Sequence, residues 1–183
     1  MTTQTGWATT AEFEEEIDIS ARPGRIYGIL DDAKSVPQLI PELNQAQPSG
    51  NNSYTAVYTV RVLGLVPLNF TLSYNVEANN YPEEVTLHFH GNVEGVIRWD
   101  LASHGDTTHV VAHANYKFSR QVIDDLIKNN MPKDGMLGGL LNRAADITGG
   151  MSSQLDLVLE SLFTRCREDI KQALRNLKTR SEG

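Results

Sequence analysis

The chain has little cysteine, no long apolar stretch and no excess of basic residues. Its single cysteine, Cys166, excludes an internal disulfide bond. No run of about eighteen consecutive apolar residues is present, which argues against a membrane-spanning helix. The N-terminal region lacks the basic start and following apolar run of a secretory signal. We therefore expect a soluble, cytoplasmic protein.

The balance of acidic and basic residues argues against a nucleic-acid partner. The chain of 183 residues carries 16 Lys and Arg against 23 Asp and Glu, which gives a net charge of −7. Nucleic-acid-binding domains concentrate Lys and Arg in a basic patch, and no such cluster stands out among the acids here. We expect no nucleic-acid partner.

Common signatures of catalysis are also missing. The sequence has no GxSxG elbow, no phosphate-binding loop and no dinucleotide-binding glycine fingerprint. His88 and His90 are two residues apart and His109 and His113 are four apart, and no Cys or carboxylate joins either pair at metal-ligand spacing. We expect exposed strand histidines, no metal site and no cofactor.

The C-terminal part carries the clearest pattern. Apolar residues recur at steps of three and four over residues 153–180, which predicts an amphipathic helix. At about 1.5 Å per residue this helix would be roughly 40 Å long, enough to cross a small domain. Its apolar face, on which Cys166 is expected to be a buried, inert thiol, needs a cover. That face comprises Leu155, Val158, Leu159, Leu162, Phe163, Cys166, Ile170, Ala173, Leu174 and Leu177.

The preceding part of the chain alternates apolar and polar residues, which is typical of strands with one wet face. A first strand is predicted at residues 12–20, and two short helices at about residues 20–30 and 34–40. Short turns rich in Gly, Asn and Pro then separate further strands, which should pair as an antiparallel meander. These strands are predicted at residues 43–48, 53–63, 68–78, 84–90, 94–103 and 108–118, and an amphipathic helix at residues 120–130.

This order of elements resembles the START/Bet v 1-like superfamily, which includes polyketide cyclases and lipid-transfer domains. Residues 17–30, followed by Asp32, Val36-Pro37 and Ile40-Pro41, resemble the start of these proteins, and residues 173–178 resemble the end of their last helix. The resemblance implies an α+β helix-grip fold, in which a seven-stranded antiparallel sheet wraps around the C-terminal helix. We expect one domain over residues 12–180, after a flexible tail at residues 1–11. The connection at residues 119–152 is longer than is usual in the superfamily.

The superfamily binds its ligands between the sheet and the long helix, so the inward-facing residues are the candidate ligand-binding set. Small side chains opposite the helix would leave space there, and the tyrosine hydroxyls would need polar partners. A solid core without a pocket is the alternative. The candidates are Tyr58, Phe70, Leu72, Tyr74, Leu87, Phe89, Ile97, Trp99, Ala112, Ala114, Tyr116, Leu155, Leu159 and Leu162.

Two apolar segments, residues 63–68 and 136–141, are predicted at one end of the sheet. Exposed apolar residues usually mark a contact, so these segments would form either a lid over the cavity mouth or a static packing contact. The lid residues would be Leu65, Val66, Met136, Leu137 and Leu140. A lid would also allow a transient contact with a membrane or a protein.

Three functions are compatible with the sequence. The first is binding or transport of a hydrophobic small molecule, such as a lipid, an isoprenoid quinone or a polyketide. The second is a polyketide cyclase. Such an enzyme needs a buried proton-transfer group, and none is identified among the residues that strand alternation places on the inward face. The third is a regulatory protein-interaction module without a ligand.

Overall fold

The computed structural model describes residues 8–62, 66–130 and 151–183. Its elements follow the chain in the predicted order, and most bounds agree with the sequence prediction within two residues. They are β1 (Ala8–Ile19), α1 (Pro23–Leu30), η1 (Ala33–Ser35), α2 (Val36–Leu39), β2 (Leu43–Gly50), β3 (Ser53–Val62), β4 (Val66–Asn80), β5 (Glu84–Gly91), β6 (Val93–His104), β7 (Thr107–Ser119), α3 (Arg120–Asn130) and α5 (Met151–Glu182).

The predicted boundary of the N-terminal tail was wrong. β1 begins at Ala8, not at residue 12, and Ala8 already pairs with Ser119 of β7. The threonines and alanine that made residues 8–11 look like a tail are compatible with strand structure, and the long β7 supplies their hydrogen-bonding partners.

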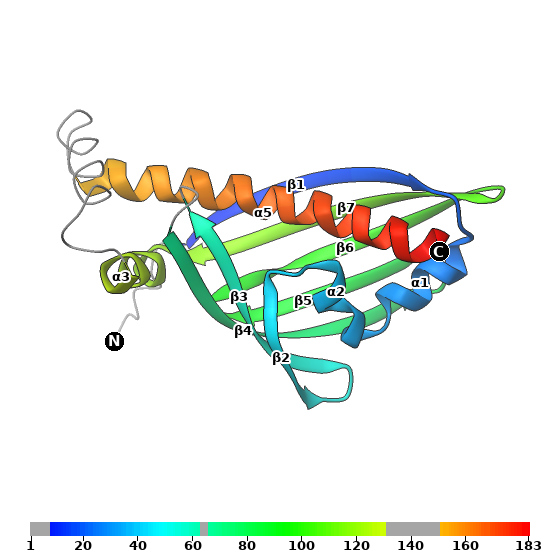
Figure 1. Ribbon diagram of the computed structural model, residues 1–183, viewed down its shortest axis with the longest axis horizontal. Helices are drawn as coiled ribbons and strands as arrows, with labels where there is room; N and C mark the ends of the chain where they lie inside the picture. Colours follow the sequence, from blue (N-terminus) through cyan, green and yellow to red (C-terminus); the bar gives the residue numbers. More distant parts are fainter. Residues whose placement is uncertain (1–7, 63–65, 131–150) are drawn as a thin grey trace, which may run out of the picture.

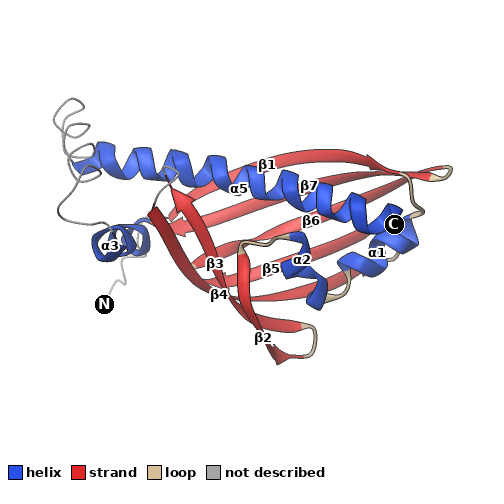
Figure 2. Ribbon diagram, in the orientation of Figure 1, coloured by secondary structure: helices blue, strands red, loops and turns tan. Residues whose placement is uncertain are grey.

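All seven strands form one sheet in the order β1-β7-β6-β5-β4-β3-β2, with antiparallel pairing throughout. The sheet is bent, and α5 lies across its concave face together with α1 and α2 (Figures 1 and 2). This arrangement confirms the predicted helix-grip fold. β1 and β2 are the two edge strands, so each has only one neighbour in the sheet.

The core lies between the concave face and the apolar side of α5, as the alternation of apolar and polar residues along the strands predicted. Phe70, Val110 and Phe118 of the sheet are fully buried, and so are Leu162 and Ile170 of α5. No described helix combines the length and the apolar character needed to cross a membrane.

One glycine permits a close approach within this core. A Cβ atom at Gly95 of β6 would lie 2.0 Å from the carbonyl oxygen of Asn115 and 3.0 Å from the ring of Phe89, and its φ is 157°. The missing side chain lets Phe89 pass over Gly95 and contact Tyr116, with ring centroids 5.2 Å apart. Gly95 therefore shapes the aromatic part of the concave face.

We predict opposite effects of alanine at two glycines. Gly95→Ala should lower the free energy of unfolding by about 2–4 kcal/mol, because the backbone at Asn115 and the ring of Phe89 must move to make room for the added Cβ atom. Gly28→Ala should raise it by about 0.5–1 kcal/mol, because Gly28 lies in α1 with no atom within 4 Å of the added Cβ. Chemical denaturation of both variants measures the difference, and equal effects would contradict the tight packing at Gly95.

Candidate functional site

A small apolar cavity lies on the concave face between the sheet and the connection from α2 to β2. Its volume, as the space open to the centre of a water-sized sphere, is about 20 Å³. That space is enough for about one water molecule and far below the roughly 300 Å³ or more of a typical ligand pocket. Its lining residues are Ile40, Leu43, Tyr58, Leu72, Tyr74, Leu87, Phe89, Val93, Ile97 and Tyr116.

The cavity gathers half of the residues that the sequence proposed for ligand contact. The predicted residues that line it are Tyr58, Leu72, Tyr74, Leu87, Phe89, Ile97 and Tyr116. Phe70, Trp99, Ala112, Ala114 and Leu162 are buried elsewhere. Leu159 lines an open groove between β1 and α5, and the side chain of Leu155 lies outside the described residues.

The position of the cavity differs from the expectation in one respect. No described residue of α5 lines it, because the apolar stripe of this helix packs directly onto the sheet. The opposing wall is formed instead by Ile40 and Leu43, which follow α2 and which were not among the residues predicted to contact a ligand. Val93, the first residue of β6, was also missed.

The predicted lid falls mostly outside the described residues. This applies to Leu65, Met136, Leu137 and Leu140, and also to the side chain of Val66. The backbone of Val66 begins β4 and pairs with Val62 of β3. The lid therefore stays a prediction.

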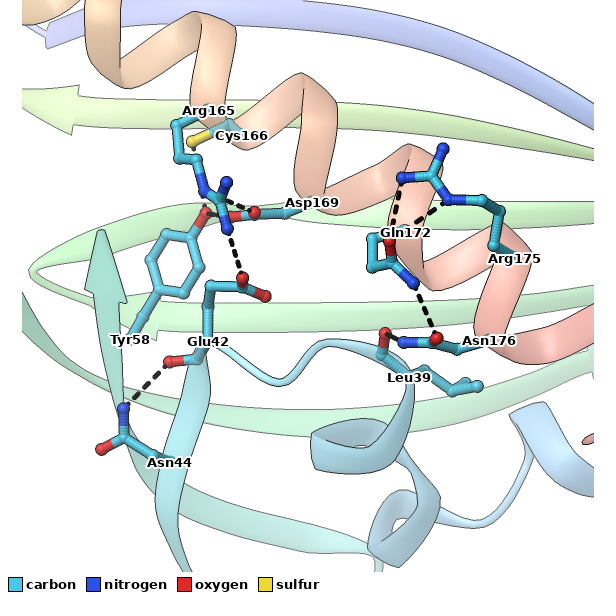
Figure 3. Close-up of polar contacts among 10 residues, drawn as sticks. All are labelled: Leu39, Glu42, Asn44, Tyr58, Arg165, Cys166, Asp169, Gln172, Arg175 and Asn176. Carbon is cyan, nitrogen blue, oxygen red and sulfur yellow. Dashed lines mark hydrogen bonds and ion pairs between the residues drawn. The ribbon is translucent and has the colours of Figure 1, made fainter. Parts of the chain in front are cut away.

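A buried polar cluster adjoins the cavity where β3 meets α5 (Figure 3). The ring of Tyr58 lines the cavity, and its hydroxyl donates a hydrogen bond of 2.7 Å to Oδ2 of Asp169. The thiol of Cys166 lies 3.4 Å from the same hydroxyl. Arg165 contacts Asp169 through Nε at 3.0 Å and donates through Nη2 to Oε1 of Glu42 at 2.6 Å. Glu42 lies between α2 and β2, so the cluster joins three parts of the fold.

Burial governs the protonation of this cluster. The side chain of Asp169 is 1% exposed. Desolvation raises its pKa to about 7, and repulsion from Glu42 acts in the same direction, against the hydrogen bond from Tyr58 and the charge of Arg165. Burial also raises the pKa of the Cys166 thiol to about 12, which agrees with the inert thiol expected from the sequence. Asp169 is thus a buried acid that exchanges its proton near neutral pH.

Two carboxyl oxygens of the cluster lack a hydrogen-bond donor. Asp169 Oδ1 and Glu42 Oε2 are buried, and no described residue donates a hydrogen bond to either. The Arg165 contact with Asp169 Oδ1 is close enough for an ion pair but is not aligned as a hydrogen bond. Unpaired buried acceptors are costly, and a proton on one carboxyl would supply the missing donor. A proton on Asp169 could be donated to Glu42, and Glu42 accordingly acts to raise the pKa of Asp169.

The sequence contained a signal for Asp169 that pattern reading overlooked. Asp169 follows Cys166 by three residues and precedes Ala173 by four, so it lies within the apolar stripe of α5 and not on the charged face. An acid in such a stripe is a candidate for a perturbed pKa. Glu42 carried no comparable signal, because only the tertiary fold brings it to Arg165.

The histidines lie on the convex face, as the parity of their strands predicted. His109 lies 2.9 Å from Asp18 and 3.5 Å from Glu16, and the carboxylate of Asp18 is the main reason why its pKa is raised. His113 contacts Glu14 at 3.1 Å and Asp100 at 3.0 Å. Carboxylates face both ring nitrogens in each case, so these imidazoles link neighbouring strands through polar side-chain contacts.

A family model described as "Polyketide cyclase / dehydrase and lipid transport" matches residues 10–149. The chain belongs to this family. No curated protein sequence matches the chain.

Solved structures with the same fold include proteins described as aromatase/cyclases. TTHA0849 from Thermus thermophilus has a TM-score of 0.51 and 18% identity, and the match covers 93% of this chain and 96% of that one. The Zhui aromatase/cyclase from a Streptomyces species gives 0.52 and 12%, with 94% and 96% covered. The di-domain ARO/CYC StfQ from the steffimycin pathway gives 0.56 and 12%, with 94% of this chain but 51% of that chain covered. At these identities the likeness concerns the fold alone.

The raised pKa of Asp169 predicts how stability depends on pH. The folded protein holds this proton more tightly than the unfolded chain, in which the pKa is about 3.8. The free energy of unfolding should therefore be lower above about pH 7 than below about pH 4, by up to about 4 kcal/mol from this residue. Asp169→Asn should remove this contribution, so that its curve differs from the wild-type curve mainly between these two values.

Denaturant titrations at several pH values measure both curves. Glu94→Gln, which changes an exposed acid of β6, is the matched control and should follow the wild type. If Asp169→Asn ran parallel to the wild type across this window, Asp169 would not carry the proton.

Proposed function

We propose that this protein binds an apolar small molecule, such as a lipid, an isoprenoid quinone or a polyketide, on the concave face of its sheet. The observation that carries the proposal is the cavity itself, whose wall consists of aliphatic and aromatic residues of the α2–β2 connection and of strands β2 to β7, with tyrosines as its polar members. Membership of a family described by cyclase, dehydrase and lipid-transport activities supports it. Binding about 300 Å² of apolar ligand surface would contribute about 7 kcal/mol before entropy costs.

The ligand must enlarge the cavity, since the present space is about 20 Å³. The two walls differ in how easily they can move. Strands β4 to β7 have neighbours on both sides in the sheet, whereas β2 is an edge strand and α2 is a single turn of four residues. Enlargement therefore takes place on the side of Ile40 and Leu43.

The experiment is native mass spectrometry of the purified protein, with identification of any molecule that co-purifies, followed by titration with the fluorescent fatty acid cis-parinaric acid. Leu87→Phe should weaken binding by about tenfold or more, because the larger ring occupies space that the ligand needs. Leu101→Phe places the same change at a buried β6 position that does not line the cavity, and it should keep the wild-type affinity. Equal weakening in both variants, or no binding of any apolar molecule by the wild type, would contradict the proposal.

A second candidate, an enzyme of the polyketide cyclase type, is favoured by Asp169. A general acid or base works best with a pKa near the working pH, and Asp169 has a pKa of about 7 and contacts a tyrosine that lines the cavity. In this reading protonated Asp169 donates to the Tyr58 oxygen, the Tyr58 hydroxyl turns to donate to a ligand carbonyl, and the proton of Asp169 follows through this hydroxyl as the carbonyl accepts one.

Binding and turnover separate the two candidates. An enzyme should convert a linear poly-β-ketone thioester to an aromatic product, which is followed by absorbance. At saturating substrate, Asp169→Asn should then lower the turnover rate of the bound substrate by about a hundredfold or more. A binding protein without catalysis would give the same slow product formation in wild type and variant.

A further inference from the structure

The wall formed by the α2–β2 connection is attached less firmly than the rest of the cavity. β2 pairs only with β3, and its register is interrupted between Asn44 and Gln47, where Gln45 has a φ of 53°. A bulge of this kind bends a strand and weakens its pairing. The side of the cavity with Ile40 and Leu43 is therefore the side that strand pairing stabilises least.

Side chains of α5 supply part of the missing attachment. Asn176 donates a hydrogen bond of 2.9 Å to the carbonyl oxygen of Leu39, at the end of α2. Arg165 donates to Glu42 at 2.6 Å (Figure 3). Glu42 stands in the sequence between the two wall residues Ile40 and Leu43, so a change in the Arg165–Glu42 contact is transmitted directly to the wall.

The charge of Arg165 is shared between two acids. Glu42 and Asp169 both contact its guanidinium, and each keeps one buried oxygen without a hydrogen-bond donor. With one proton on the pair, the cluster is neutral and the two carboxyls can hydrogen-bond each other. Without that proton, two carboxylates compete for one cation in a poorly hydrated place, and their repulsion acts between α5 and the wall.

We propose that Glu42, Asp169 and Arg165 form a proton-operated latch, which holds the α2–β2 wall against α5 when the acid pair shares a proton and lets the cavity open when the proton leaves. The use of this opening for a ligand rests on the proposed binding function, whereas the movement itself does not. Arg165 is about half exposed, so the proton can exchange with solvent on that side.

The other groups around Asp169 do not titrate in the same range. Tyr58 of β3 and Tyr116 of β7 have a pKa well above the usual value, first because they are buried. The Cys166 thiol keeps its proton for the same reason, and arginine stays charged. Asp169, in contact with Glu42, is thus the group of this cluster that can change charge near neutral pH.

The test is hydrogen–deuterium exchange of the full ligand-free chain at about pH 5.5 and about pH 8.5, corrected for intrinsic exchange rates. Peptides covering residues 36–44 should exchange about tenfold faster at the higher pH, whereas β6 and β7 should not change. Asp169→Asn, whose neutral amide can donate to Glu42, should stay protected at both pH values. Arg165→Met should exchange fast at both.

Arg167→Met is the matched control, because Arg167 lies on the same helix but pairs with Glu15 of β1. It should keep the pH dependence of the wild type. Equal protection of residues 36–44 at both pH values in the wild type, or an unchanged pH dependence in Asp169→Asn, would overturn the latch.

Stopped-flow binding of cis-parinaric acid at the same two pH values separates the two proposals. The latch predicts faster association at the higher pH in the wild type and a pH-independent rate in Asp169→Asn. Binding without pH-dependent exchange would overturn the latch and keep the binding function. pH-dependent exchange in a protein that binds no apolar molecule would overturn the binding function alone.

Discussion

The packing of α5 onto the concave face is the contact on which the rest of the structure depends. Leu162, Ile170 and Leu177 are fully buried there and span the central and C-terminal part of the helix. An amphipathic helix of this length is not stable with its apolar stripe exposed, and α5 is the longest of the described helices that cover the apolar face of the sheet. The sheet bends around this helix (Figure 1), and the cavity lies where the α2–β2 connection covers the concave face and α5 does not.

The same contact explains why the polar cluster costs stability. Asp169 lies inside the buried stripe, where an apolar residue would avoid the desolvation penalty. The penalty is partly offset by Tyr58, which donates to Asp169, and by Arg165, which reaches in from the half-exposed side of the helix. The remaining two acceptors stay without donors unless the acid pair holds a proton. The free energy of the folded state should therefore depend on pH through this cluster.

Much of the fold could be predicted from the sequence, because alternation fixes which side chains share a strand face and the three-four spacing fixes the apolar side of a helix. Phe70, Leu72 and Tyr74 were placed on one buried face in this way, and burial agrees. The strand ends were harder to predict, since the pairing of Ala8 with Ser119 depends on a strand about a hundred residues away in sequence.

The site could be predicted only in part. Parity identified the tyrosines and leucines of the sheet wall, but the contribution of Ile40 and Leu43 depends on how the α2–β2 connection folds back over the sheet. The burial of Asp169 could have been inferred from its spacing in the helix. The role of Glu42 could not, because it contacts Arg165 across 123 positions of sequence. The size of the cavity could not be predicted, because it depends on side-chain packing that residue patterns do not specify.

A nearly filled cavity also changes how affinity should be understood in this protein. If only a fraction of molecules is open, the apparent affinity for a ligand is reduced by that fraction, so a population of about 1% costs about a hundredfold. The contacts that close the wall, from Asn176 to Leu39 and from Arg165 to Glu42, then determine ligand affinity although neither residue of α5 lines the cavity. The α2–β2 connection must both cover the apolar face and move away to admit a ligand. An acid pair that changes its protonation allows the connection to do the first at one pH and the second at another.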